Sequence, residues 1–177
     1  MRTSGLFALM ASACLIPAAA AESELYLNGG YSAYDSDGTT LSALTARGGI
    51  EFNTLIGAEF ETSFGLGAEE LDEDTGAELE LENQFAGYLT ARYEVLPSLD
   101  AIGRVGYSTG EFQASNNGVS SDAEADGFAF GVGGEYMITE HFGLRGDYTR
   151  IEVDDDELDG GVNVFALTGV FKFGTVR

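Results

Sequence analysis

The residues of this sequence that could do chemistry are mostly charged, and their positions are unusual. The chain has 177 residues, of which 30 are Asp or Glu, 8 are Lys or Arg and 1 is His. The segment "RGGIEFNTLIGAEFETSFG" (Arg47–Gly65) alternates arginine, glutamate and glycine with isoleucine and phenylalanine. Charged groups inside a protein can serve as acid–base catalysts, as metal ligands or as ion pairs that hold a fold together.

Catalysis has little support, because the sequence offers a single histidine and no partners for it. His141 stands in a short connection beside Thr139 and Glu140. A nucleophile needs a base and a group that orients the base, all held by packing. We therefore expect His141 to be a solvated turn residue, and the protein to be neither an enzyme nor a carrier of a cofactor. An enzyme with its site at the rim of the fold is the alternative.

Two acidic segments resemble oxygen-ligand loops for calcium, namely "DEDTG" (Asp72–Gly76) and "DDDELDG" (Asp154–Gly160). Counted from Asp155, the second segment has Ala166 where an EF-hand has its closing glutamate. An EF-hand is therefore excluded, and no residue is predicted as a metal ligand. Loose binding of divalent cations stays open beside the simpler interpretation, in which charge keeps the loops soluble and apart.

Alternation with a period of two dominates the chain and predicts strands. Glycine is abundant, with 25 residues, and proline is scarce, with 2. Each predicted strand has about ten residues, the length that a tilted strand needs to cross a bilayer. The predicted strands are Glu24–Tyr34, Leu44–Asn53, Leu55–Gly65, Glu82–Val95, Asp100–Phe112, Gly127–Ile138, Phe142–Val153 and Val162–Phe173.

The connections between these strands alternate in length. Tight connections follow the second, fourth and sixth strands, whereas longer polar connections follow the first, third, fifth and seventh. The long ones read "DSDGTT", "GAEELDEDTGAELE", "QASNNGVSSDAEAD" and "DDDELDGG", and none of them contains Lys or Arg. Short turns at one end and long loops at the other predict an all-β fold, a closed up-and-down antiparallel barrel of eight strands.

One face of these strands is aromatic and aliphatic, and the other is charged, polar and rich in glycine. A water-soluble barrel would turn the apolar face inward, but eight strands enclose an interior that side chains just fill. Side chains as bulky as Phe60, Phe85 and Phe130 on nearly every strand would overfill it. We therefore predict a charged interior and an apolar exterior that contacts lipid. Such a transmembrane sheet must close, because lipid cannot satisfy its backbone groups.

The strand arginines mostly share their face with strand carboxylates, so the interior charges are predicted to pair. An unpaired buried charge is costly, and a hydrogen-bonded pair offsets that cost. The predicted network consists of Arg47, Glu51, Glu59, Arg92, Arg104, Glu135, Arg145 and Asp147. A structural role is preferred over cation conduction, because eight strands leave little free bore. Tyrosines near strand ends predict aromatic girdles at the membrane surfaces: Tyr26, Tyr31, Tyr93, Tyr107, Tyr136 and Tyr148.

The first residues have the layout of a cleavable secretory signal. The stretch "MRTSGLFALMASACLIPAAAAES" has one arginine, an apolar run too short to span a membrane, and then small residues. We predict a signal peptide over residues 1–21 and a barrel domain over residues 22–177. The single cysteine, Cys14, falls in this leader, so the mature chain has no disulfide. A net charge of −22 excludes nucleic acid as a natural partner.

Four segments carry a family resemblance: "GIEFNTLIGAEFETSFG", "ARYEVLPSLDAIGRVGYS", "FAFGVGGEYMITEHFGLRGDYT" and "ALTGVFKF". They resemble the small outer-membrane β-barrel family that includes the OmpA transmembrane domain and OmpX. The resemblance implies eight antiparallel strands, a polar lumen, both termini in the periplasm and a place in a Gram-negative outer membrane. Members of this family typically end on a phenylalanine that the barrel-assembly machinery reads. Phe173 matches that position, although "GTVR" follows it.

The resemblance and the charge pattern together indicate a structural or surface-interaction role with little or no pore activity. The partners expected are outer-membrane lipids and lipopolysaccharide, and the assembly machinery through the strand ending at Phe173. Divalent cations that bridge the acidic loops to lipid phosphates are a further expectation. A narrow cation-preferring channel is one alternative, and a soluble periplasmic barrel that holds a small ligand is another.

Overall fold

The computed structural model describes residues 23–36, 39–67, 69–72, 77–116, 119–153 and 161–176. These residues form β-strands and short connections, and among them there is no helix long and apolar enough to cross a membrane. The predicted signal peptide lies outside the described residues, as do most of the two calcium-like segments. The leader and the domain boundary that follows it therefore stay predictions.

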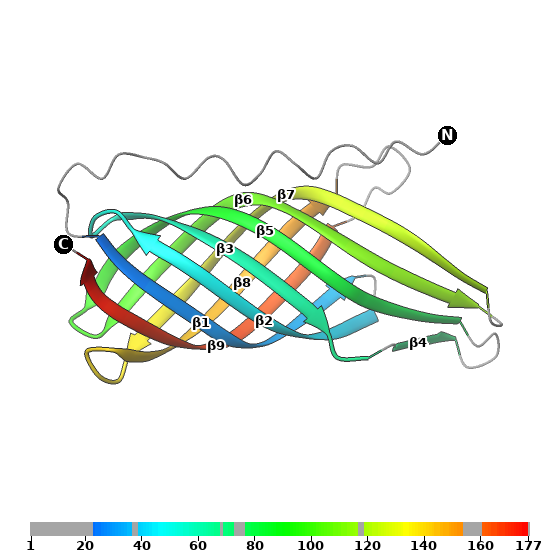
Figure 1. Ribbon diagram of the computed structural model, residues 1–177, viewed down its shortest axis with the longest axis horizontal. Coiled ribbons are helices and arrows are strands. Elements are labelled where there is room, and N and C mark those ends of the chain that lie inside the picture. Colours follow the sequence, from blue (N-terminus) through cyan, green and yellow to red (C-terminus); the bar gives the residue numbers. More distant parts are fainter. Residues whose placement is uncertain are drawn as a thin grey trace.

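The strands form one closed antiparallel barrel. In chain order they are β1 (Ser23–Ser36), β2 (Thr39–Glu51), β3 (Ile56–Gly65), β4 (Glu69–Asp72), β5 (Ala77–Leu96), β6 (Leu99–Asn116), β7 (Val119–Met137), β8 (Phe142–Val153) and β9 (Gly161–Val176). The short β4 pairs only with β5, while β3 pairs with β5 and β9 pairs with β1, so the other eight strands form a ring. Figure 1 shows this ring of tilted strands. The predicted eight-stranded up-and-down barrel is confirmed.

Tight turns join β2 to β3, β5 to β6 and β7 to β8 at the end of the barrel where β1 starts and β9 ends, which we call the turn end (Figure 1). The opposite end is the loop end. In the first turn, Asn53 Oδ1 accepts hydrogen bonds from the backbone N–H groups of Leu55 and Ile56, each at 2.8 Å. In the third, Thr139 Oγ1 accepts from the N–H of Phe142 at 2.9 Å. Short polar side chains favour such turns because they bond locally to the backbone.

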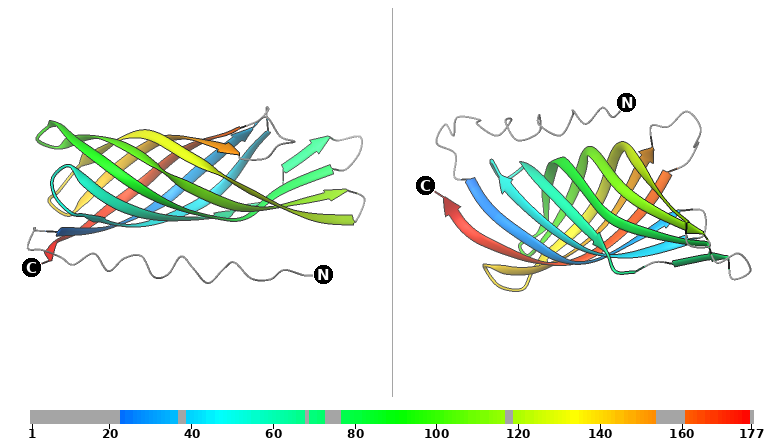
Figure 2. Two further views of the ribbon diagram at one scale, coloured as in Figure 1. Left: turned by 90° about the horizontal axis from the view of Figure 1, so that it is seen from above. Right: turned by 45° about the vertical axis from the view of Figure 1, so that its right-hand side comes forward.

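Three strands continue well past the wall of the barrel at the loop end. β5 has 20 residues, β6 has 18 and β7 has 19, whereas β3 has 10. Figures 1 and 2 show these strands running beyond their neighbours, with β4 beside β5. Much of the sequence expected to form loops, residues 67–80 and 113–126, is therefore strand, since β6 and β7 stay paired as far as Asn116 and Val119.

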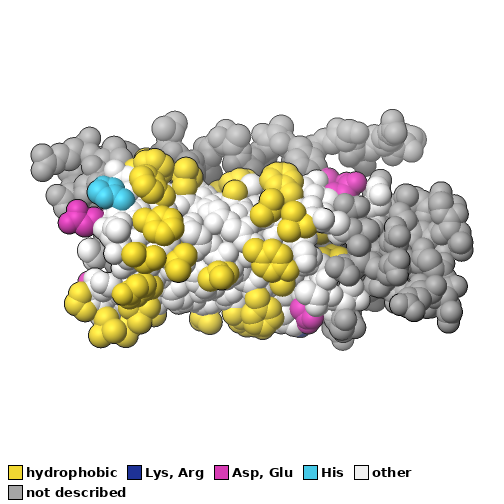
Figure 3. Space-filling model, turned by 90° about the horizontal axis from the view of Figure 1, so that it is seen from below, with side chains coloured by type: hydrophobic (Ala, Val, Ile, Leu, Met, Phe, Trp, Pro, Cys, Tyr) yellow, Lys and Arg dark blue, Asp and Glu magenta, His cyan; other side chains and the backbone are white. Residues whose placement is uncertain are grey.

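The wall of the barrel is apolar outside and polar inside. Outward side chains are strongly exposed, with fractions of 62% for Leu89, 65% for Val132 and 64% for Leu167. Inward charged side chains are buried, with 2% for Arg47 and 0% for Arg145. Figure 3 shows hydrophobic side chains across one face of the wall, where no described Lys or Arg side chain is visible and acidic ones lie towards the ends. This distribution is that of a barrel that contacts hydrocarbon, the reverse of a water-soluble one.

Two expectations about individual residues are wrong. Tyr26, predicted for an aromatic girdle, is 2% exposed and faces the lumen, because it shares parity with Asn28 and not with Leu27. The last strand does not end at Phe173, because β9 continues to Val176 and pairs there with the start of β1. The ends of the first and last strands therefore extend the barrel by several residues at the turn end.

Glycines on the two faces of β6 have different surroundings, and this difference predicts a difference in stability. A Cβ at Gly106 would overlap the backbone oxygen of Gly87 on β5, whereas a Cβ at Gly103 would meet no heavy atom within 4 Å. Overpacking costs about 1–3 kcal/mol. We expect Gly106→Ala to lower the free energy of unfolding by that amount, and Gly103→Ala to leave it nearly unchanged, in urea titrations of the bilayer-folded protein. Equal losses in the two variants would contradict the close approach of β5 and β6.

Candidate functional site: the charged lumen

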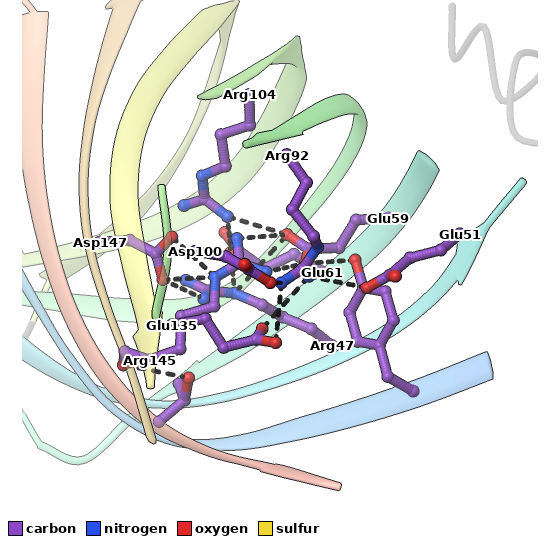
Figure 4. A network of polar contacts seen from close by, with 12 residues as sticks. Arg47, Glu51, Glu59, Glu61, Arg92, Asp100, Arg104, Glu135, Arg145 and Asp147 are labelled. Carbon is purple, nitrogen blue, oxygen red and sulfur yellow. Dashed lines mark hydrogen bonds and ion pairs between the residues drawn. The ribbon is translucent and has the colours of Figure 1, made fainter. Parts of the chain in front are cut away.

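The middle of the lumen holds three arginines and three carboxylates, which we call the central cluster. They are Arg47 on β2, Glu59 and Glu61 on β3, Arg104 on β6, and Arg145 and Asp147 on β8. Each belongs to the inward parity of its strand, because successive side chains of a strand point to opposite faces. Figure 4 shows these side chains converging from different walls of the barrel. The formal charges of the central cluster balance.

Arg47 and Arg104 together connect four strands, β2, β3, β6 and β8. Arg47 lies 2.6 Å from Glu61 and 2.6 Å from Asp147, which reach it from β3 and β8. Arg104 lies 2.8 Å from Glu61 and 3.1 Å from Glu59. Hydrogen bonds in which both groups are charged are shorter and stronger than neutral ones. Each guanidinium therefore links walls of the barrel that have no backbone pairing with each other.

Arg145 completes the central cluster from β8. Its guanidinium lies 2.7 Å from Glu59 across the lumen and 2.9 Å from Asp147 on its own strand. Glu59 also accepts a hydrogen bond of 3.0 Å from the hydroxyl of Tyr26. Arg145 and Glu59 have side chains that are 0% exposed, so their charges are fully removed from water. Partners on several sides offset the desolvation that such burial costs.

A second group of charges, the mouth cluster, lies at the turn end of the lumen. Arg92 lies 2.8 Å from Glu51, 2.8 Å from Glu135 and 3.0 Å from Asp100. Lys172 lies 3.2 Å from Glu135 and 3.3 Å from Glu51. Several of these side chains are partly exposed, with 20% for Asp100 and 13% for Glu51, so water reaches this end of the lumen.

Uncharged polar side chains fill the lumen between the central cluster and the loop end. The hydroxyl of Tyr34 lies 2.8 Å from Ser63 Oγ and 2.9 Å from Gln84 Oε1. Thr45 Oγ1 lies 2.8 Å from the same Ser63 hydroxyl and 2.6 Å from the hydroxyl of Ser32. We call this set the hydroxyl layer. Its groups satisfy one another, as buried polar groups must.

A further set of buried side chains, most of them apolar, packs beside the hydroxyl layer and the central cluster, and we call it the apolar layer. It shares Tyr34 with the hydroxyl layer, and its Tyr88 ring lies 4.3 Å from Cζ of Arg104. It is formed by the buried side chains of Tyr34, Leu41, Ala43, Leu81, Ala86, Tyr88, Ala129, Ile151 and Val164. This layer was not predicted, because charged residues are the most conspicuous feature of the inward face in the sequence. The alternation of the sequence does indicate that Leu41 points into the lumen, because Leu41 has the same parity as Thr45 and Arg47 on β2.

The structure places all eight predicted network residues on the lumen side and divides them between the central and mouth clusters. Three residues that the prediction left out belong to these clusters: Glu61, Asp100 and Lys172. Lys172 lies near the C-terminal end of β9. Its parity would have placed it correctly, because it is in phase with Thr168 and Val170 and out of phase with the exposed Phe171.

His141 lies in the turn between β7 and β8 and is exposed. Its ring centroid is 6.3 Å from that of Phe171. The neighbouring Thr139 hydroxyl accepts hydrogen bonds from the backbone N–H groups of His141 and Phe142, so it serves the turn. Within the part of the chain that the structure describes, no group of three or more His, Cys, Asp or Glu side chains is placed to hold a metal ion. The calcium-like prediction falls largely on residues outside that part.

Comparisons with known proteins agree with the barrel. The family model described as "Outer membrane protein beta-barrel domain" matches residues 6–173. Among solved structures, the N-terminal β-barrel domain of Pseudomonas aeruginosa OprF has a TM-score of 0.63 at 12% identity, covering 86% of this chain and 98% of that one. OprG from Pseudomonas aeruginosa has a TM-score of 0.61 at 14% identity, covering 87% and 97%.

A third structure, Ail of Yersinia pestis in complex with the heparin analogue sucrose octasulfate, has a TM-score of 0.60 at 17% identity, covering 85% of this chain and 97% of that one. Identities this low show a shared fold and no more. No curated protein matches the chain. The family match, in contrast, spans nearly all of the strands described above. The protein is located in the outer membrane, where barrels turn their short connections to the periplasm and their long ones outward. The chain belongs to the outer membrane protein β-barrel domain family.

Proposed function

We propose that this protein is a non-conducting outer-membrane barrel with a structural or surface-interaction role. The observation that carries the proposal is that buried side chains fill the described lumen, in the mouth cluster, the central cluster, the hydroxyl layer and the apolar layer. Eight strands enclose a space that side chains just fill. An ion on its way through would have to break paired charges and displace packed side chains, most of them apolar, which is costly.

The paired charges have a structural role in this proposal. Arg47 connects β2 to β8, Arg104 connects β6 to β3, and Arg145 connects β8 to β3. Neither β2 and β8 nor β3 and β8 are neighbours in the sheet. The ion pairs therefore add ties across the barrel to those that the backbone ladder supplies around it.

The surface-interaction role is assigned to the parts of β5, β6 and β7 that extend beyond the barrel wall at the loop end. The extended parts of β5, β6 and β7 stand on the outer side of the membrane, and the four long connections contain no Lys or Arg. Ail was solved with a sulfated heparin analogue. Any anionic partner would be repelled by the acidic exterior of this chain, so we propose that lipopolysaccharide is bound through divalent cations that bridge the acidic loops to its phosphates. Assembly would use β9, on which Phe173 is 54% exposed.

Recording from planar bilayers tests the absence of conduction. We expect the refolded wild-type protein to insert and to give no discrete current steps in concentrated potassium chloride, because the central cluster and the apolar layer together close the lumen. An open porin recorded in the same bilayers serves as the control that steps are detectable. Insertion is verified by the faster gel migration of an unheated sample of the same material.

Two results would overturn the proposal in different ways. Discrete cation-selective steps would favour the narrow channel, in which the carboxylates of the mouth cluster attract the permeating ion. A protein that stays monodisperse after removal of detergent would favour the soluble ligand-binding barrel.

A further inference from the structure

Arg150 differs from every other described cation in that it forms no ion pair with a described residue. The other five pair with carboxylates in the lumen: Arg47, Arg92, Arg104, Arg145 and Lys172. Arg150 lies on β8, on the outward parity that it shares with Tyr148 and Glu152. The long connections contain no Lys or Arg. Among the residues that the structure describes, Arg150 is thus the single positive charge on the outward face at the loop end.

The guanidinium of Arg150 is held in a fixed position against β9. Its Nη1 donates hydrogen bonds of 3.1 Å to the backbone oxygen of Gly161 and 3.1 Å to Asn163 Oδ1. A Cβ at Gly161 would lie 2.5 Å from Cζ and Nη2 and 2.6 Å from Nε, so the glycine makes room for the guanidinium to lie flat. Nε and Nη2 donate to no described residue. Two adjacent N–H groups in this fixed arrangement match the oxygens of a phosphate.

A groove of about 430 Å³ opens on the outer face of β1, β8 and β9 next to this arginine. Its lining includes Tyr31, Ala33, Gly146, Tyr148, Phe165 and Leu167. The rings of Tyr148 and Phe165 lie 5.2 Å apart on one side, and small residues lie between the larger ones. Asn163 joins the groove to the arginine, because its Oδ1 accepts from the hydroxyl of Tyr148 at 2.9 Å as well as from Arg150.

We propose that Arg150 and this groove form a binding site for a phosphorylated lipid of the outer leaflet, with an acyl chain in the groove and a phosphate on Nε and Nη2 of Arg150. The groove lies on the lipid-facing wall, so hydrocarbon is its natural occupant. The arginine lies at its loop end, where the headgroups of the outer leaflet begin. This inference rests on the outer-membrane barrel and its orientation, and it is independent of whether the lumen conducts.

Native mass spectrometry of the detergent-solubilised full chain tests the site with lipid A and dephosphorylated lipid A as matched probes. EDTA is present throughout, so that divalent cations cannot bridge the acidic loops to phosphate. We expect the wild type to bind lipid A more tightly than its dephosphorylated form. Arg150→Gln should remove this preference, a loss of about tenfold in affinity for lipid A, which is the change expected of a charge-assisted hydrogen bond.

Two further variants test the parts of the site separately. One moves the charge without removing it, and the other fills the groove without changing the charge. Gly161→Ala keeps the arginine but displaces its guanidinium, so it should reduce the preference for phosphate as well. Gly146→Leu fills the groove and should weaken both probes equally. Gly103→Leu is its matched control, since it adds the same side chain at an outward glycine with open surroundings, and we expect it to bind both probes like the wild type.

The proposal is overturned if Arg150→Gln keeps the preference for phosphorylated lipid, or if Gly146→Leu and Gly103→Leu behave alike. Displacement of lipid A by inorganic phosphate alone would also overturn it, because the site would then bind free phosphate. Each variant is first shown to migrate as a folded barrel on an unheated gel. A failure of the lipid site is thereby distinguished from a failure of the barrel on which the proposed function rests.

Discussion

Replacement of Arg145 by methionine should lower the free energy of unfolding by about 3–5 kcal/mol, the usual cost of removing one partner from a buried ion pair. The side chain of Arg145 is 0% exposed and lies 2.7 Å from Glu59 and 2.9 Å from Asp147. Without the guanidinium, Glu59 and Asp147 lose a neutralising charge and the four hydrogen bonds that Arg145 donates to them. A urea titration of the bilayer-folded protein, read from the gel mobility of unheated samples, measures the change.

A double variant provides the control for this effect. Arg145→Met combined with Glu59→Gln restores the charge balance of the central cluster, so it should recover a large part of the stability lost in the single variant. Asp147 keeps Arg47 as its partner at 2.6 Å. If the two losses simply add, residues 145 and 59 are not coupled, and the assignment of a cross-barrel pair fails.

An arginine on the outer wall should lower the free energy of unfolding strongly in the middle of the apolar wall and only slightly at its edge. Val132→Arg on β7 replaces a side chain that is 65% exposed and lies between the exposed rings of Phe130 and Tyr136 on the same face. We expect a loss of about 2–4 kcal/mol, the depth-dependent cost of a cation on the lipid face of a barrel near the bilayer midplane. The same urea titration measures it.

Ile138→Arg is the matched control for the outer wall, because Ile138 is 54% exposed in the turn directly after β7. Near the membrane surface the expected loss is about 0–1 kcal/mol. Two equally small losses would mean that the wall faces water, since surface substitutions in a soluble protein usually change stability by less than about 0.5 kcal/mol.

The parity of the strands was predictable from the sequence, because lipid and a narrow lumen impose opposite demands on alternate residues. Phe60, Phe130 and Leu167 had to lie outside once Arg47 and Glu59 were placed inside. The identity of each ion pair was not predictable in the same way. Arg47 and Asp147 are 100 residues apart, and their contact depends on the tilt and stagger of the strands around the ring, which no local pattern encodes.

The extent of the strands was underestimated for a related reason. The stretch "AELELE" (Ala77–Glu82) alternates as regularly as any membrane strand, and it forms the start of β5. Its first four residues were assigned to a long polar loop because acidic residues surround them. Outside the bilayer, a strand is stabilised by backbone pairing with its neighbour and needs no apolar surface towards lipid. Hydrophobicity therefore does not indicate where such a strand begins.

The free edge of β7 has a consequence for crowding in the membrane. Pairing between β7 and β8 begins at Gly127 and Val153, so residues 119–126 of β7 have no second neighbour among the described strands. An unpaired edge is a template on which another chain can add and polymerise. The side chain of Asp126, where this edge begins, is exposed. A carboxylate at that point sets like charges against one another when the edges of two copies approach, which opposes the fusion of neighbouring barrels into a continuous sheet.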